Sequence, residues 1–396
     1  MICVTLVRFQ RHRDKVDGLT IALSRRVCKR VAYTAIAMGT EHKDALLELW
    51  REALFSGGRR ARAAGHGGER YPWFYEQNPS GRAATWLGLR EPGREIIGCG
   101  SVCPRVVHVA GKPLRGGVLS DFAVAKAHRI AGCAVAIQRA IVDHCRETGY
   151  DFLYGYPNQD ALAVLKRVGY EVLGFAVPYS KPLRTGVKLG ERIKKRRLGQ
   201  AFERPEVAEL LGLVLDLGLA TLDAGRMLHR LLTYRVEDLP RADARFDDLW
   251  ALRAYGRVMG EKTSRYLNWR YASYRAGEHR FFCLADRRGQ LAGYLVYSIA
   301  GDTAFVADLF TPRCDETVEH LLLHFAMRMR RSPCAAIYLS YFGDEAFGKR
   351  LEGLQFFRRS PHRSVILFAG EHLPAATAAV IRGPGNWFML DGELDV

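Results

Sequence analysis

The chain has 396 residues, of which 48% are hydrophobic and 26% are charged. This composition is typical of a globular protein, and no run of about 18 or more uncharged apolar residues, the length of a membrane-spanning helix, occurs in it. The chain is too long for a single ordinary core, so we expect two domains. A formal net charge of +17 raises the question of a polyanionic partner.

The nine cysteines form no CxxC pair and have no histidine at a zinc-binding spacing, which predicts reduced thiols and no metal site. Residues 1–31 place an apolar stretch before a basic one, the reverse of the order in a signal peptide. We therefore expect a cytoplasmic protein. Residues 1–31 are expected to be a disordered extension or the product of an upstream start codon.

Residues 32–183 alternate between helical and strand patterns, which predicts a mixed α/β fold. Helices are expected where apolar residues fall on one stripe, and two of them are closed by Gly149 and Gly169. Strands are expected where residues alternate or run apolar. In chain order the expected elements are helix 41–55, strands 84–90, 95–111 and 116–124, helix 133–148, strand 151–157, helix 159–168 and strand 170–181.

The junction between strand 116–124 and helix 133–148 carries the clearest functional signal. The sequence there, Ser120 to Ile141, reads SDFAVAKAHRIAGCAVAIQRAI. A turn from a strand into a helix directs backbone N–H groups and the positive end of the helix dipole to one spot, which suits an anion. Gly132 and its small neighbours would let a phosphate approach the backbone, and Arg129 adds a charged donor.

Residues 184–235 are expected to be a basic and helical linker. Arg184 to Arg197 holds seven basic residues and one acid, so nucleic acid (tRNA), an anionic membrane surface or a phosphorylated substrate could each meet it, as could solvent alone. Leu210 to Leu232 is apolar but interrupted by charged residues, so we expect a buried or interdomain helix rather than a transmembrane one.

The second part of the chain, 236–396, repeats the pattern of the first. Trp73, Tyr75 and Gly81 fall on Trp269, Tyr271 and Gly277 at a constant offset of 196 residues, as the printed sequence shows. The order of the motifs does not change, although the offset drifts, so a duplication is expected. The repeated aromatic residues are expected to be core residues in the main.

The motifs resemble the GNAT acyltransferase superfamily, whose signature of Arg or Gln, two residues, Gly, one residue, then Gly or Ala fits Arg129, Gly132 and Ala134. Asn158, Ala161, Gly169 and Tyr170 fit a second family element. The resemblance implies two tandem GNAT-like domains, 32–183 and a degenerate 236–396, each a mixed sheet flanked by helices, with acetyl-CoA or another acyl-CoA as cosubstrate. It also implies a set of cofactor contacts, namely Phe122, Ala123 and Val124 to pantetheine, Arg129, Ile130, Ala131, Gly132, Cys133 and Ala134 to the pyrophosphate, and Asn158 to the thiol end.

Candidate catalytic groups lie on the strands beside this turn. An alkyl amine is neutral in only about one molecule in 2,500 at pH 7, so attack on a thioester benefits from a base. Asp121 is the candidate base, with bracing of a loop as the alternative. The family often has a general-acid Tyr where this chain has Leu165, so Tyr154, Tyr156 or water is expected to protonate the leaving thiolate.

The expected function is therefore acyl transfer from acyl-CoA to an amine such as an amino sugar, an amino acid or a small amine. The sequence also allows two alternative functions. One is a Fem-type transferase that uses aminoacyl-tRNA, which the positive charge would suit. The other is a non-catalytic binding protein with a degenerate fold, which the missing Tyr would suit.

Overall fold

The computed structural model describes residues 32–53, 67–92, 94–129, 132–184, 205–227, 234–254, 256–274, 278–312, 316–361 and 363–393. The expected extension 1–31 and residues 185–197 of the basic segment lie outside these residues. The described part of the chain is a mixed α/β fold in two halves.

The first half has the order of elements that its sequence predicts. Its strands are β1 (Tyr33–Ala37), β2 (Ala84–Arg90), β3 (Glu95–Val109), β4 (Lys112–Val124), β5 (Phe152–Gly155) and β6 (Glu171–Pro182). Its helices are α1 (Lys43–Ala53), α3 (Gly67–Tyr71), α4 (Gly132–Thr148) and α5 (Gln159–Arg167). Gly149 and Gly169 follow α4 and α5 with φ of 76° and 103°, so both helices end as predicted.

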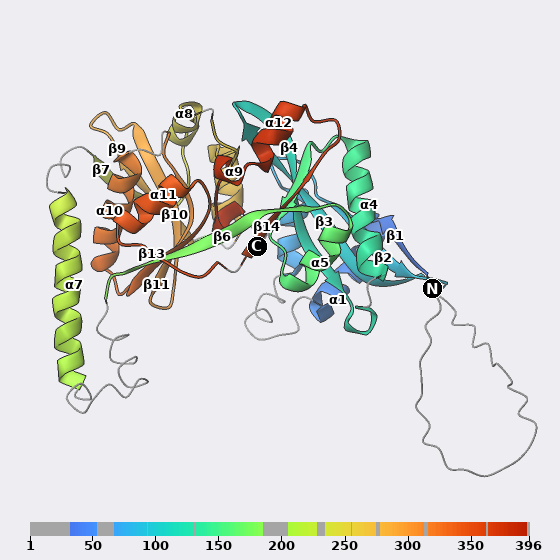
Figure 1. Cartoon of the computed structure of the whole chain (residues 1–396), viewed down its shortest axis with the longest axis horizontal. Coiled ribbons are helices and arrows are strands. Elements are labelled where there is room, and N and C mark those ends of the chain that lie inside the picture. The colour runs from blue at the N-terminus through green and yellow to red at the C-terminus, as the bar shows by residue number, and fades with distance from the viewer. Residues whose placement is uncertain are drawn as a thin grey trace, which may run out of the picture. The chain divides into compact units, whose positions relative to one another are not determined.

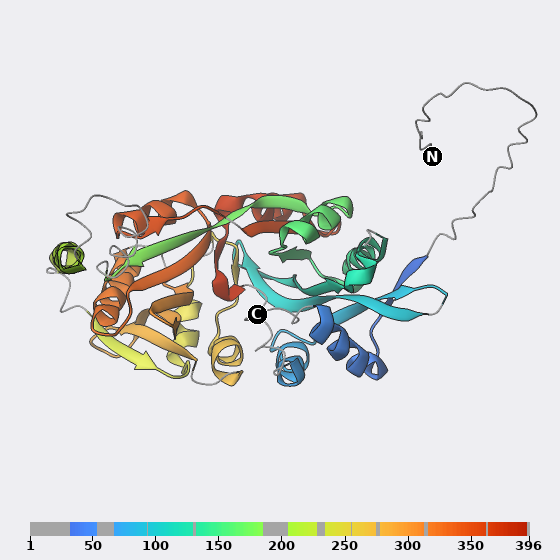
Figure 2. The same ribbon diagram turned by 90° about the horizontal axis from the view of Figure 1, so that it is seen from below.

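The helices of the first half cover both faces of its strands, as Figure 2 shows. Helix α4 buries Ile137, Ile141 and Cys145 against one face, together with Leu165 of α5. Helix α1 buries Leu46 and Trp50 in the core on the opposite face. The sheet is thus the middle layer of three.

The second half repeats this arrangement. Its strands are β7 (Arg235–Leu239), β8 (Met259–Gly260), β9 (His279–Ala285), β10 (Leu291–Ala300), β11 (Thr303–Phe310), β12 (Ala336–Gly343), β13 (Phe357–Arg358), β14 (Arg363–Ala369) and β15 (Phe388–Leu390). Its helices are α8 (Arg245–Ala251), α9 (Ser264–Leu267), α10 (Glu316–Arg330), α11 (Glu345–Gly353) and α12 (Ala375–Arg382).

Each half gives its last long strand to the other half. Strand β14 pairs with β5 of the first half, whereas residues 177–182 of β6 pair with β12 of the second. The two exchanged strands also pair with each other, so one sheet runs β1-β2-β3-β4-β5-β14-β6-β12-β11-β10-β9-β7. Figure 1 shows β6 passing from one half into the other. Segments 32–183 and 236–396 therefore share strands.

The repeated aromatic residues meet at the junction of the halves. Each Trp of the repeat lies in a π-helical turn, Pro72–Glu76 or Asn268–Ser273. The Trp73 indole N–H donates to the carbonyl of Trp269 at 2.7 Å, and the Trp269 indole donates to the carbonyl of Trp73 at 2.9 Å. Both side chains and those of Tyr75 and Tyr271 are buried, which confirms that they are core residues.

Helix α7 (Pro205–Met227) lies between the two halves in sequence and departs from expectation. The helix exists, but Leu210, Leu213 and Leu217 are each more than 60% exposed. The prediction of a buried or interdomain helix is wrong, because only one narrow side of α7 contacts the rest of the protein. Within the described residues no helix is both long and apolar enough to cross a membrane.

Candidate functional site

The point where the pairing of β4 with β5 ends is the central feature of the first half. The two parallel strands pair only at Gly116–Phe152, Gly117–Leu153 and Val118–Tyr154, although β4 continues to Val124. Strand β5 ends at Gly155, so the later residues of β4 have no paired strand on that side among the described residues. Backbone polar groups left unpaired in this way can pair with an extended molecule that carries amide groups.

A bulge in β4 lies beside this gap in the pairing. The register against β3 shifts between Cys99 and Ser101, so that Asp121 and Phe122 both face Gly100. Asp121 has a φ of 48°, which is uncommon for a non-glycine residue. A bulge of this kind redirects side chains, and it sends Phe122 and Val124 toward α4 while Asp121 faces the other side of the sheet.

The N-terminus of α4 adjoins the end of β4, as the sequence predicts. The helix starts at Gly132, and a cavity of ≈ 350 Å³ opens there between Tyr33, Gly132, Val135, Ala136, Arg139 and Arg167. Gly132, at the helix N-terminus, and two arginines thus line one open space, an environment that suits a phosphate. Of the predicted turn residues, Ile130 and Ala131 lie outside the described residues.

The other predicted turn residues take distinct positions. Arg129 is exposed, and its Nε donates to the Val124 carbonyl at 3.4 Å. Cys133 is fully buried against the sheet, and burial raises the pKa of its thiol to about 11. Cys133 can therefore offer a ligand only its backbone, whereas Gly132 and Ala134 lie nearer the surface.

Arg139 and Arg167 were not among the residues predicted from the sequence. Arg139 lies seven residues after Gly132, two turns along the same side of α4. That spacing was a signal that could have identified it. Arg167 ends α5 and reaches the cavity only through the packing of α5 on α4, which no local pattern reveals.

Asn158 caps a helix in this structure. Its side-chain Oδ1 accepts a hydrogen bond from the backbone N–H of Ala161 at 2.8 Å, at the start of α5. The amide Nδ2 is thus the group that would reach a ligand. The contact with a thiol end stays a prediction.

Two tyrosines at the end of β5 differ in exposure. Tyr154 is 1% exposed and packs against Trp387, while Tyr156 is half-buried just beyond the strand. Burial raises the pKa of both hydroxyl groups well above that of an ordinary tyrosine, and the carboxylate of Glu393 raises it further. Both phenols therefore keep their protons at neutral pH, and Tyr156 is the more accessible donor.

Asp121 is held by two donors from the segment before β2. Arg70 Nη1 donates to Asp121 Oδ2 at 2.6 Å, and the Tyr75 hydroxyl donates to the same oxygen. The Arg70 and Asp121 side chains are only 6% and 8% exposed. Burial, followed by the charge of Asp121, raises the pKa of Tyr75 well above its usual value. The carboxylate is thus fixed in place, and its role as a base stays a prediction.

The corresponding place in the second half is occupied. Strands β11 and β12 also pair only at their start, from Thr303–Ala336 to Phe305–Tyr338. Beyond that point β15 pairs with β12, from Gly343–Phe388 to Tyr341–Leu390, and it also contacts β11. The chain itself thus fills the gap that stays between β4 and β5 in the first half.

Charged groups reinforce this difference. Helix α10 has Glu316 and Glu319 in its first turn, and Arg350 of α11 binds Glu319 at 2.6 Å. After β15 the chain places Glu393 between Arg105 and Lys262, at 3.2 and 3.4 Å. Burial alone would raise the pKa of Glu393, but these two cations hold it below the usual value.

Comparisons with known proteins agree with this geometry. Residues 37–173 match the family described as Acetyltransferase (GNAT) domain. A comparison with curated protein sequences finds no significant match.

Three solved structures share the fold over both halves. A conserved Enterococcus faecalis protein described as a probable N-acyltransferase is 12% identical, with a TM-score of 0.58 over 86% of this chain and 73% of its own. A GCN5-related N-acetyltransferase from Kribbella flavida is 14% identical, with a TM-score of 0.54 over 86% of this chain and 71% of its own. Saccharomyces cerevisiae N-myristoyltransferase with bound myristoyl-CoA is 10% identical, with a TM-score of 0.52 over 85% of this chain and 79% of its own.

Proposed function

Residues 37–173 match the Acetyltransferase (GNAT) domain family, and from this premise we propose that the chain is an acyl-CoA-dependent N-acyltransferase whose chemistry lies in the first half. The observation that carries the proposal is the position of the gap between β4 and β5 next to the N-terminus of α4. A pantetheine arm in the gap would place its pyrophosphate at the helix N-terminus, near Arg139 and Arg167. The Kribbella and Saccharomyces structures with this fold are a named N-acetyltransferase and an enzyme with bound acyl-CoA, which supports this cosubstrate class.

The acyl group is proposed to be acetyl and the acceptor an amine of low molecular mass. In this reaction the amine nitrogen attacks the thioester carbonyl, the amide bond forms, the C–S bond breaks, and CoA leaves as the thiolate. Asp121 takes the proton of the amine from the side of the sheet opposite α4, and Tyr156 or water supplies a proton to the thiolate. Arg70 and Tyr75 orient the carboxylate through Oδ2.

Binding of the cosubstrate is the first test. Acetyl-CoA at about 100 times its dissociation constant should stabilise the protein by about 2.7 kcal/mol, which a thermal shift detects. Myristoyl-CoA in a parallel titration distinguishes a short from a long acyl group, and mass spectrometry of the purified protein identifies any retained acyl-CoA. Absence of stabilisation by every acyl-CoA would contradict the proposal.

The net charge of +17 favours one competing function, transfer from aminoacyl-tRNA. Filter retention of tRNA that falls steeply with salt, without stabilisation by acyl-CoA, would favour that function. A cytoplasmic location, in solution or on the cytoplasmic face of a membrane, suits both proposals, and cell fractionation tests it.

A further inference from the structure

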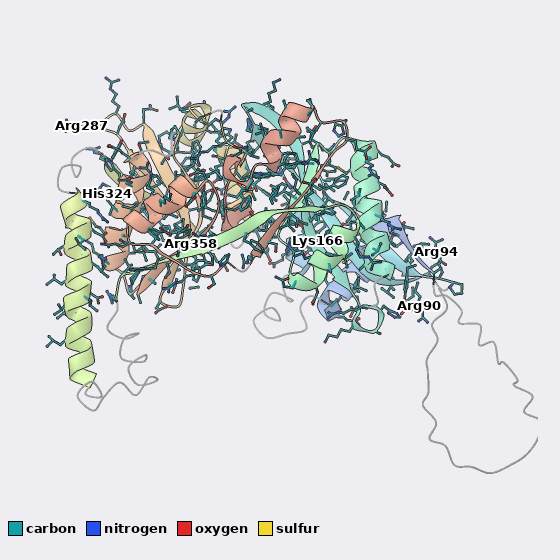
Figure 3. The ribbon with its side chains drawn as sticks, viewed as in Figure 1. Arg90, Arg94, Lys166, Arg287, His324 and Arg358 are labelled. Atoms are coloured by element: carbon teal, nitrogen blue, oxygen red, sulfur yellow. The ribbon has the colours of Figure 1, made fainter. Side chains whose placement is uncertain are left out.

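Helix α7 has its polar and apolar sides reversed relative to a typical surface helix. The side that faces the rest of the protein carries Asp223, which is fully buried and bound by Lys181 and Arg330, each at 2.9 Å. Asp216 lies two turns earlier on the same side and is half-buried. Figures 1 and 2 show α7 at the edge of the second half. Helix α7 contacts helix α10, whose His324 lies next to α7 in Figure 3.

The outward side of α7 is apolar. Leu210, Leu213, Val214, Leu215, Leu217 and Leu222 are between 50% and 64% exposed. Between Leu210 and Leu222 the only charged residue is Asp216, which lies on the inner side. A group of exposed leucines of this size marks a surface that binds a membrane or another protein.

The width of this surface identifies the kind of partner. At 3.6 residues per turn, Leu213 and Leu215 lie roughly 200° apart across the outward side. A second helix covers a stripe of about 100°, so a second α7 packed along this length of about 35 Å would cover only about half of the width of the apolar side. The acyl chains of a lipid bilayer can cover the whole of such a convex surface, whereas a second copy of the protein leaves much of it in water.

Helix α7 itself carries four acids and one arginine, so an anionic membrane would be attracted by the cations gathered around its C-terminal end. Three arginines are exposed in this region, namely Arg184, Arg226 and Arg331. They lie near the C-terminal end of α7, since Arg184 donates to the Ser332 carbonyl at 2.8 Å and Arg330, the neighbour of Arg331, binds Asp223 of α7. The chain as a whole carries +17. Cations beside an apolar helix are attracted to anionic headgroups. We propose that α7 lies in the plane of an anionic lipid surface, with its leucine side among the acyl chains and the protein on the aqueous side.

Flotation with vesicles tests this proposal. The protein should float with vesicles of phosphatidylcholine and phosphatidylglycerol, and binding to phosphatidylcholine alone should be at least about tenfold weaker. The double variant Leu210→Gln, Leu217→Gln should bind anionic vesicles at least about tenfold more weakly, since two leucines no longer leave water. Leu252→Gln is the matched control, because Leu252 is 65% exposed outside α7. Circular dichroism checks that each variant is folded.

Three results would overturn the proposal. Failure of the native protein to bind anionic vesicles would show that another segment of the chain, or nothing, covers α7. A dimer in light scattering that the double variant dissociates would assign the surface to a second copy. Unchanged binding of the double variant would show that charge alone attracts the protein to lipid. None of these results bears on acyl-CoA binding in the first half.

Discussion

The two halves of the molecule share a fold and differ in what lies beyond the paired part of two parallel strands. In the first half, β4 and β5 pair no further than Val118 and Tyr154, and Gly132 at the start of α4 lines a cavity. In the second, β11 and β12 also pair only at their start, but β15 enters the gap and acids occupy the start of α10. The fold therefore provides the gap, and the sequence of each half decides whether a ligand or the chain itself fills it.

The largest effect is expected from Gly132→Glu. A Cβ at this position would lie 2.5 Å from Cδ2 of Tyr33, and the carboxylate would oppose the helix dipole. Calorimetry with acetyl-CoA should give one site per chain in the native protein and no detectable binding in the variant. Glu319 lies at the position equivalent to Gly132 in the second half, 187 residues later, and Glu319→Gly should create no new site because β15 fills that gap.

A stoichiometry of two, or acetyl-CoA binding that survives Gly132→Glu in a folded variant, would contradict the assignment of cosubstrate binding to the first half alone. The thermal midpoint of each variant separates loss of binding from loss of fold.

Asp121 and Asp308 occupy equivalent positions of the repeat, at an offset of 187 residues, and Asp121→Asn and Asp308→Asn compare them. Asp121→Asn should lower kcat by about 10² to 10⁴ at pH 7 and by less at pH 9, where more of the amine is already neutral. Asp308 is buried beside Lys262 in the second half, so Asp308→Asn should change stability but leave kcat within a few-fold. An equal loss at both pH values for Asp121→Asn would identify a bracing residue, as its contacts with Arg70 and Tyr75 also allow.

Glu393→Gln tests whether the segment after β15 closes the second half. Removing one partner of a buried ion pair costs about 3 to 5 kcal/mol of unfolding free energy. Because Arg105 and Lys262 hold the pKa of Glu393 below 4.5, this stabilisation is present above pH 4.5 and is lost as pH falls through the lower folded-state pKa. Denaturant unfolding at pH 7 and at acid pH measures both effects.

The matched control is Glu371→Gln, since Glu371 is exposed at its contact with Arg146 and should contribute little. Equal stability of Glu393→Gln and Glu371→Gln at pH 7 would mean that the cluster around Glu393 does not hold the segment in place.

Local features of the fold followed from the sequence, while the pairing of the halves did not. The stripe of Ile137, Ile141 and Cys145 and the closing glycines predicted α4 and α5 because helix periodicity and capping are local. The exchange of β6 and β14 was not predicted. In a duplicated fold the last strand of each half finds an equivalent neighbour in either sheet, so its pattern does not specify which one.

The candidate site shows the same limit. The anion-binding turn was visible in the sequence, because strand, glycine and helix follow one another directly. Arg167 and β15 reach their positions through tertiary packing, so no spacing announced them. The exposed leucines of α7 were misjudged because apolar composition predicts burial, whereas here Asp223 is the buried group.

Arg129→Glu should have a moderate effect on the first half alone. Loss of a charged donor near a phosphate costs about 1.5 to 3 kcal/mol, roughly 10- to 150-fold in the CoA dissociation constant. Arg287→Glu is the control, since it makes the same change of charge on the far part of the second half (Figure 3). Equal weakening by both variants would mean that net charge, rather than a contact at α4, governs CoA binding.

The smallest effect is expected from Tyr156→Phe. Burial raises the pKa of Tyr156 well above its ordinary value of about 10, whereas the conjugate acid of the leaving thiolate has a pKa of about 8.5. Full proton transfer from this phenol is therefore uphill, and its hydroxyl contributes a hydrogen bond of about 0.5 to 1.5 kcal/mol, roughly 2- to 13-fold in kcat. Tyr154→Phe should change stability more than kcat, since Tyr154 is 1% exposed. A loss above about 100-fold for Tyr156→Phe, with an altered pH profile, would show instead that Tyr156 delivers the proton and that the gap between β4 and β5 holds the reacting thioester at its hydroxyl.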